Sequence, residues 1–195
     1  MSIKRTVTVL AVVALAVGLS ACSGNSGSMA ARVGDQLITE AQIESQALGV
    51  EEILSVDPEN YGSLNGTNFV LQNDILAAMI DQALDDVGIQ ITDDDRSSYW
   101  QSAFDPAMAE YTLWDDPRTH DAMRGYIDYA LIQTLANDGS LDTEAFMASF
   151  GALSVEVNPR YGQWDASQGT VTSAVSGQAS GQLATPVDFA GLGAA

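Results

Sequence analysis

The stretch NFVLQNDILAAMIDQALDDVG, residues 68–88, decides that this chain is mainly helical. Its apolar residues recur at the spacing of one wide helical face: Phe69, Leu76, Met79, Ile80, Ala83, Leu84 and Val87. Gly88 then stands where a helix C-terminus takes a positive φ. The pattern predicts an amphipathic helix over 68–87, the strongest helix in the chain.

A short β-hairpin is predicted before this helix. Gly34-Asp35 separates two short apolar segments, 31–33 and 36–38, and glycine at the first turn position takes a positive φ without steric cost. Thr39, followed three residues later by Gln42, forms a capping-box pattern, so a helix should begin at Glu40. Residues 57–66 hold several turn signals and are predicted to form a loop.

More helix starts are predicted after residue 91. Thr92 precedes three aspartates, whose carboxylates would face the free N–H groups of a helix N-terminus. Asp105-Pro106 and Asp116-Pro117 each place a capping aspartate before proline, which suits the first helical position, and the second of these helices should end at 137–139.

The last predicted elements are a short helix over about 142–150 and a strand. Residues 153–157 alternate apolar and polar side chains at period two. Such a strand has one buried face, and it could pair with the opening hairpin.

The first 22 residues are typical of a bacterial lipoprotein signal. Lys4 and Arg5 precede an apolar run over 7–19, which is shorter than the roughly 18 residues of a membrane span. Leu19-Ser20-Ala21-Cys22 then reads as a lipobox, with cleavage expected between Ala21 and Cys22 and lipid, including palmitate, expected on Cys22. The alternatives are an ordinary signal peptide with a chance cysteine, or a buried free thiol. A single cysteine rules out a disulfide within the chain.

The charge of the chain limits its partners. Loss of Lys4 and Arg5 with the leader lowers the formal net charge from −19 to −21 and leaves five arginines and no lysine. Phosphate backbones and anionic lipid surfaces repel such a chain, so we expect no nucleic acid partner and a membrane contact made only through the lipid on Cys22. The expected location is the cell membrane, lipid-anchored, on the extracytoplasmic side.

Composition divides the chain into four segments. Residues 1–21 are the expected signal peptide, and 22–30 a flexible tether rich in serine and glycine. Residues 31–165 form the expected domain. Residues 166–195 carry one charge, Asp188, among small and polar residues and are expected to be disordered.

Residues 31–39, ARVGDQLIT, read as a strand, a turn and an Ile-Thr step into a helix. Residues 76–84, LAAMIDQAL, continuing through 87–93, VGIQITD, read as a long helix and its exit. These two segments resemble the opening and the long helix of the N-terminal domain of SurA-type periplasmic chaperones and related foldase lipoproteins. Residues 158–162, before Trp164-Asp165, are similar to the end of short SurA-N-like lipoproteins of actinobacterial type. The resemblance implies an α+β, SurA-N-like helical domain with a small antiparallel sheet from the hairpin and the C-terminal strand.

The resemblance does not imply catalysis. Full-length relatives carry a parvulin prolyl-isomerase domain after the helices, and only two residues lie between Phe150 and Leu153. The sequence also lacks serine-elbow and phosphate-loop motifs. His120 is expected to be a solvated surface residue rather than a catalytic base or zinc ligand, and the aspartates at 93–95 and 115–116 to be helix N-termini rather than a calcium site. No enzyme activity, cofactor or metal is therefore expected.

One cluster of apolar residues is a candidate client-binding surface. Its members lie on two short predicted helices: Tyr99, Trp100, Phe104, Met108, Tyr111 and Trp114. Methionine and aromatic side chains can form an adaptable apolar surface, but helical spacing of large apolar residues is also typical of a packed core. Arg160 with Tyr161 could be a recognition turn, or Arg160 could pair with a carboxylate while Tyr161 and Trp164 pack at the sheet edge.

We therefore expect a lipid-anchored protein that binds unfolded or newly exported polypeptides without catalysis, as a chaperone does. The alternative is an envelope assembly or adaptor lipoprotein that holds one defined partner. A binder of one partner should lose function on a single hot-spot substitution, whereas a generalist should tolerate it.

Overall fold

The computed structural model describes residues 28–56, 66–103, 116–166 and 169–172. These residues form an α+β fold with five helices and two small antiparallel sheets. The helices are α1 (Glu40–Val56), α3 (Gly66–Val87), α4 (Asp93–Ala103), α6 (Pro117–Asn137) and α7 (Thr143–Ala152). The strands are β1 (Met29–Val33), β2 (Gln36–Thr39), β3 (Val155–Val157), β4 (Gln163–Asp165) and β5 (Thr170–Thr172).

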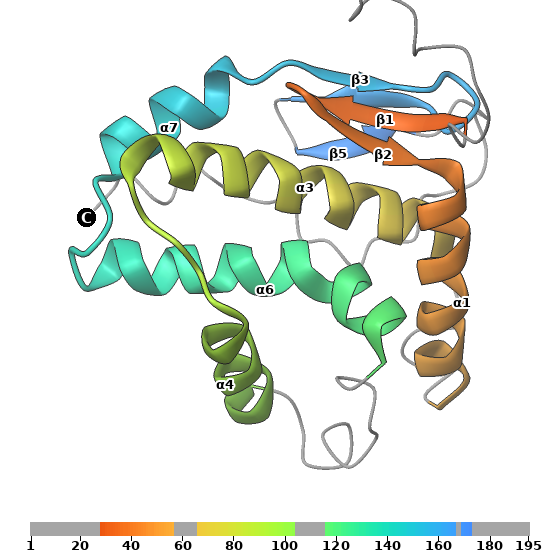
Figure 1. Ribbon diagram of the computed structural model, residues 1–195, viewed down its shortest axis with the longest axis horizontal. Coiled ribbons are helices and arrows are strands. Elements are labelled where there is room, and N and C mark those ends of the chain that lie inside the picture. The colour runs from red at the N-terminus through yellow and green to blue at the C-terminus, as the bar shows by residue number, and fades with distance from the viewer. Residues whose placement is uncertain (1–27, 57–65, 104–115, 167–168, 173–195) are drawn as a thin grey trace, which may run out of the picture.

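Helix α3 is the centre of the fold. It runs under the strands and above α6, with α1 at one end and α7 near the other (Figure 1). Its buried face includes Leu71, Ile75, Ile80 and Leu84, and apolar residues of the sheet and of α1, α6 and α7 complete the same core. The amphipathic helix predicted over 68–87 is confirmed, with its start two residues earlier.

The approach of α6 to α3 depends on one glycine. A Cβ added at Gly125 of α6 would lie 2.2 Å from the backbone oxygen of Asn73 on α3. That separation is far below van der Waals contact, so the two helices can come this close only because residue 125 has no side chain.

The opening hairpin and the closing strand form one three-stranded sheet in the order β2-β1-β3. Gly34 has a φ of 52°, which the two-residue turn requires. Arg32 pairs with Leu37 on one side and with Glu156 of β3 on the other. The predicted hairpin and its pairing with a C-terminal strand are confirmed, although β3 covers only 155–157 because Leu153 serves as the C-cap of α7.

Capping interactions explain where the helices begin. The Gln42 N–H donates to Thr39 Oγ1 at 3.2 Å, and the Asp116 carboxylate accepts from the Arg118 N–H at 2.9 Å. The Ala145 N–H donates to Asp142 at 3.0 Å, which puts the start of α7 one residue later than predicted. At the end of α3, Gly88 has the predicted positive φ, 74°.

Two predicted boundaries are wrong. The tether was expected to extend to residue 30, but Met29 and Ala30 belong to β1, and Ala30 is fully buried. The disordered tail was expected from residue 166, but Thr170–Thr172 forms β5 against β4, with Val171 only 4% exposed. A triplet of β-branched residues favours a strand even inside a segment whose average composition is that of a linker.

Several predictions lie outside the described residues: the leader, the lipobox, most of the loop at 57–66, the helix start at Asp105-Pro106 and the remainder of the tail. In the part of the chain that the structure describes, no helix is long and apolar enough to cross a membrane.

Candidate functional site

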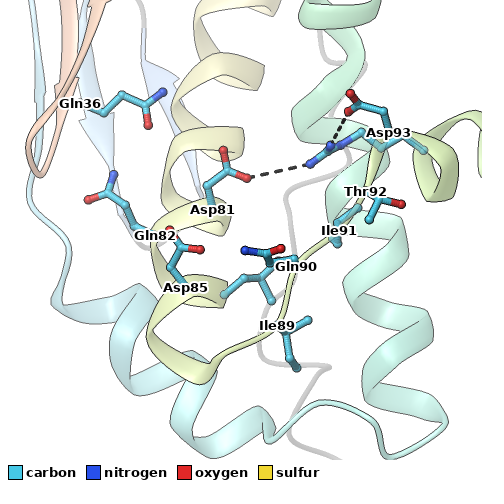
Figure 2. Close-up of a pocket in the computed structure, with 11 residues that line it drawn as sticks. Gln36, Asp81, Gln82, Asp85, Ile89, Gln90, Ile91, Thr92 and Asp93 are labelled. Atoms are coloured by element: carbon cyan, nitrogen blue, oxygen red, sulfur yellow. Dashed lines mark hydrogen bonds and ion pairs between the residues drawn. The ribbon is translucent and has the colours of Figure 1, made fainter.

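An open pocket of about 470 Å³ lies beside the C-terminal half of α3 (Figure 2). Helix α3 contributes Asp81, Gln82, Leu84 and Asp85, and Gln36 at the start of β2 stands on one side. The opposite side is the connection between α3 and α4 together with the first turn of α4: Ile89, Gln90, Ile91, Thr92, Asp93 and Arg96.

Local hydrogen bonds fix both sides of the pocket. The Gln82 side-chain amide donates to the backbone oxygens of Val33 and Ala78, each at 3.1 Å, and so fastens the hairpin to α3. After Gly88 reverses the chain, the Ile89 N–H donates to the Leu84 oxygen at 3.0 Å. The connection is therefore held against the helix it has just left, and Ile89 packs on the core.

The lining of the pocket combines acidic and apolar side chains on both of its sides. Three carboxylates line it, those of Asp81, Asp85 and Asp93, against the single guanidinium of Arg96. The apolar lining consists of Leu84, Ile89 and Ile91. Such a surface can hold an apolar group and a cationic group at the same time.

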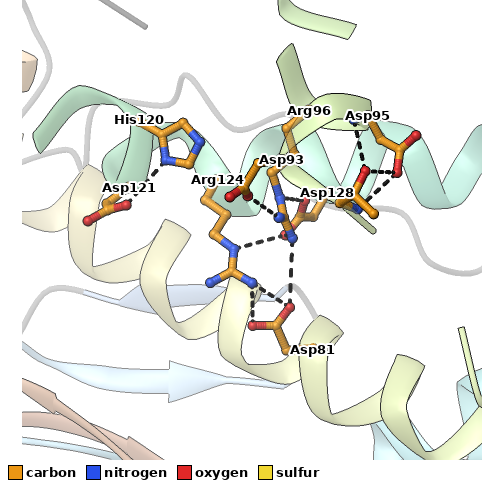
Figure 3. Close-up of polar contacts among 9 residues, drawn as sticks. Asp81, Asp93, Asp95, Arg96, His120, Asp121, Arg124 and Asp128 are labelled. Carbon is orange, nitrogen blue, oxygen red and sulfur yellow. Dashed lines mark hydrogen bonds and ion pairs between the residues drawn. The ribbon is translucent and has the colours of Figure 1, made fainter. Parts of the chain in front are cut away.

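An ion-pair network includes the pocket-lining residues Asp81, Asp93 and Arg96 and extends from them to Arg124 and Asp128 (Figure 3). Arg96 of α4 donates through Nε to Asp128 Oδ1 at 2.6 Å and through Nη2 to Oδ2 at 3.1 Å. Its Nη1 donates to Asp93 at 2.8 Å. Arg124 of α6 donates to both oxygens of Asp81 on α3, at 2.7 and 2.6 Å. The network therefore joins α4 to α6 and α6 to α3.

Asp128 is the most buried member of the network. Its side chain is 0% exposed and that of Arg96 only 5%. Burial raises the pKa of Asp128 above its ordinary value, while the hydrogen bonds and charge of Arg96 act in the opposite direction. The charged form of Asp128 therefore depends on Arg96.

Asp74 forms a second buried polar cluster, between α3 and α1. Its carboxylate accepts from Gln42 Nε2 at 2.8 Å, and the Gln46 amide, with its nitrogen facing Asp74, donates to both oxygens at 3.0 and 3.1 Å. Burial raises the pKa of Asp74 to about 7, although both glutamines lower it. Asp74 does not line the pocket. Its hydrogen bonds with Gln42 and Gln46 hold α1 against α3.

The structure does not expose the part of the aromatic cluster that it describes. Trp100 is 2% exposed and Tyr99 is half-buried. The other four members, Phe104, Met108, Tyr111 and Trp114, lie outside the described residues. For Trp100, burial agrees with the core-packing alternative rather than with an exposed client surface.

His120 and the aspartates at the start of α4 occupy structural positions. His120 is half-buried rather than fully solvated, and Asp121 lies beside it, with Nδ1 and Oδ1 3.2 Å apart. Thr92 donates its N–H and hydroxyl to Asp95 at 2.9 and 2.6 Å, and the Asp95 N–H donates to Thr92 Oγ1 at 3.2 Å. These contacts lower the pKa of Asp95 and confirm the predicted helix N-terminus.

Arg160 pairs with a carboxylate, as one of the two alternatives for it predicted. Its Nη1 lies 2.8 Å from Glu40 Oε1, and its Cζ lies 5.0 Å from the centre of the Tyr161 ring. Tyr161 and Trp164 both pack against the core. The contact joins the segment after β3 to the start of α1.

Sequence reasoning missed the pocket and the ion-pair network. One local signal was available: α4, DDDRSSYWQSA, has a single basic residue among three acidic ones. Among the described residues, no group of three histidine, cysteine or acidic side chains could hold a metal ion. No known family model, curated protein or solved structure matches the chain.

Proposed function

We propose that this protein binds unfolded or newly exported polypeptides reversibly and without catalysis, while a lipid on Cys22 anchors it to the extracytoplasmic side of the cell membrane. The observation that supports this best is the open pocket beside α3, whose lining combines carboxylates, amides and apolar side chains. A surface of this mixed kind suits polypeptide segments, which present polar backbone and apolar side chains together.

The fold is proposed to be of the SurA-N type. The order of elements supports this: a hairpin leads into α1, the long helix α3 exits through Gly88 into α4, and β3 returns to pair with β1. The resemblance concerns the helical part of these proteins and not their parvulin module, so what it supports here is polypeptide binding.

The client site is proposed at the pocket rather than at the aromatic cluster. Trp100 is 2% exposed, so a client could reach its ring only after α4 had moved. Gln90 and Gln36 in the pocket are exposed, and the two lie on opposite sides of it. A client can therefore enter without rearranging the fold.

The membrane anchor has its own test, which does not depend on client binding. Cys22→Ala removes the only sulfur that could carry the lipid, so the variant should lose incorporation of labelled palmitate and leave the membrane fraction. Ser23→Ala is the matched control and should retain both. Palmitate labelling that persists in Cys22→Ala would contradict the lipobox interpretation.

The function is tested by suppression of client aggregation. The full chain, held in nanodiscs of zwitterionic lipid, is mixed at near-stoichiometric ratios with several unrelated unfolding proteins, and light scattering is followed against empty nanodiscs. We expect suppression with each client. Gln90→Trp should weaken it because the indole fills the pocket, while Gln133→Trp, at an exposed position of α6 that does not line the pocket, should not.

Three results would change the proposal. No suppression beyond empty nanodiscs would contradict general client binding. Suppression restricted to one partner would favour the adaptor alternative. Equal suppression by the parent chain and Gln90→Trp would place the client surface outside the pocket.

A further inference from the structure

We propose that the pocket beside α3 selects client segments by a positively charged side chain, arginine or lysine, and so favours basic stretches of exported polypeptides. This inference rests on the proposed function, because it names the class of client that the pocket takes. It starts from the difference between the pocket's three carboxylates and its single guanidinium.

Asp85 is the carboxylate that is left for a ligand. Asp81 is paired with Arg124 at 2.6 Å, and Asp93 with Arg96 at 2.8 Å. Within the described ranges, no arginine or histidine nitrogen lies within 4.0 Å of the exposed Asp85 carboxylate. A positively charged side chain of a client could therefore form an ion pair with the Asp85 carboxylate.

The chain has few cations of its own with which to neutralise this site. Beyond residue 21 it has five arginines and no lysine. Four of these arginines form ion pairs with carboxylates other than Asp85: Arg96, Arg118, Arg124 and Arg160. The charge of Asp85 is therefore left for a cation that approaches from solution.

The apolar part of the lining explains why the ligand is a long side chain rather than a simple cation. Ile89 and Ile91, which are half-buried, can cover the methylene stem of lysine or arginine, while Asp85 receives the charged head. The side-chain oxygens of Gln36 and Gln90 can accept the remaining N–H groups. A metal ion would gain nothing from these apolar neighbours.

The position of the pocket favours a polypeptide as the carrier of this side chain. Gln36, on one side of the pocket, is the first residue of β2, and β2 is one of the two edge strands of its sheet among the described strands. Edge strands offer backbone groups to an extended chain. The pocket volume of about 470 Å³ is enough for one side chain and its neighbouring backbone.

The test compares two fluorescent peptides that are identical except at one central residue, which is arginine in one and citrulline in the other. Citrulline keeps the shape of arginine and lacks its charge. The full chain in zwitterionic nanodiscs should bind the arginine peptide about two- to five-fold more tightly by fluorescence anisotropy, the size expected for an ion pair at an exposed carboxylate. Higher ionic strength should reduce this preference.

The variants separate the pocket from the overall charge of the protein. Asp85→Asn should lose most of the arginine preference. Glu44→Gln, which removes one negative charge at an exposed position of α1, should retain it. Circular dichroism of both variants confirms that they are folded.

Each outcome has a distinct meaning. Equal binding of both peptides by the parent chain would overturn the charge selection and leave polypeptide binding in place. An arginine preference that survives in Asp85→Asn, or that is lost equally in Glu44→Gln, would overturn its assignment to the pocket. Binding of neither peptide, together with no suppression of client aggregation, would remove the proposed function itself.

Discussion

Arg96→Met should destabilise the protein by about 3–5 kcal/mol at neutral pH, the usual cost of removing one partner of a buried ion pair. Two of the lost contacts, at 2.6 and 3.1 Å, go to Asp128, whose side chain is 0% exposed. After the substitution, the nearest cation to Asp128 is Arg124, with its Nε 3.5 Å from Oδ2.

The third contact contributes little to this figure. The Asp93 side chain is 82% exposed, so its pair with Arg96 at 2.8 Å is a surface ion pair. Such pairs contribute about 0–1 kcal/mol, because water solvates the carboxylate well without its partner. Nearly all of the expected loss therefore comes from leaving Asp128 charged and buried.

The pH dependence of the loss provides a second test. Burial already raises the pKa of Asp128, and Arg96 opposes that rise, so Arg96→Met should raise this pKa further. A group whose pKa is higher in the folded protein than in the unfolded chain makes stability fall as pH rises between the two values. The deficit of the variant should therefore be largest at neutral pH and should shrink towards about pH 4 as Asp128 is protonated.

Urea unfolding followed by circular dichroism measures both quantities. The matched control is the double variant Arg96→Met/Asp128→Leu, which removes the charge together with its partner and should recover much of the lost stability. A loss below about 1 kcal/mol at neutral pH, or a loss that does not change with pH, would refute the reasoning, because Asp128 would then not depend on Arg96 for its charge.

Two further substitutions test the contacts of α3. Asp74→Asn should stabilise the protein by roughly 2–3 kcal/mol more at about pH 8 than at about pH 5, because the raised pKa of about 7 makes ionisation of the buried carboxyl costly. If urea unfolding showed the same change in stability at both pH values, this expectation would be contradicted. Gly125→Ala should cost about 1–3 kcal/mol or more, since the new Cβ would lie 2.2 Å from the Asn73 oxygen. Its control, Gly151→Ala on α7, meets nothing within 4 Å and should stabilise the helix; thermal unfolding that ranks the two the other way would contradict the close approach of α6 to α3.

The parts of the fold that the sequence predicts are those that neighbouring residues specify. The turn at Gly34 depends on the backbone freedom of one residue, and the starts of α1, α6 and α7 each depend on a side chain that hydrogen-bonds within three positions. Such interactions are visible in a short window of sequence. The strand at Thr170–Thr172 was missed because the buried contact of Val171 is made with residues far away in the chain.

The candidate site could not be predicted in the same way. Arg96 and Asp128 are 32 residues apart, and so are Gln42 and Asp74. The chain has 26 acidic residues, and no local pattern marks Asp74 or Asp128 as buried, while most of the other acidic residues that the structure describes are exposed. Only the packing of α1, α3, α4 and α6 decides that Asp74 and Asp128 are shielded from solvent. The pocket depends on the same packing.

The ion-pair network links the stability of the fold to the shape of the pocket. Arg96 lines the pocket and also donates hydrogen bonds to the buried Asp128 of α6. This pair therefore fixes the position of the part of α4 that lines the pocket. Arg96, Arg124 and Arg160 form ion pairs with Asp128, Asp81 and Glu40. None of these arginines pairs with Asp85, which is exposed to solvent. A substitution that breaks the Arg96–Asp128 pair should therefore lower stability and client binding together. Asp85→Asn should change client binding while leaving stability within about 0.5 kcal/mol, as is usual for a surface position.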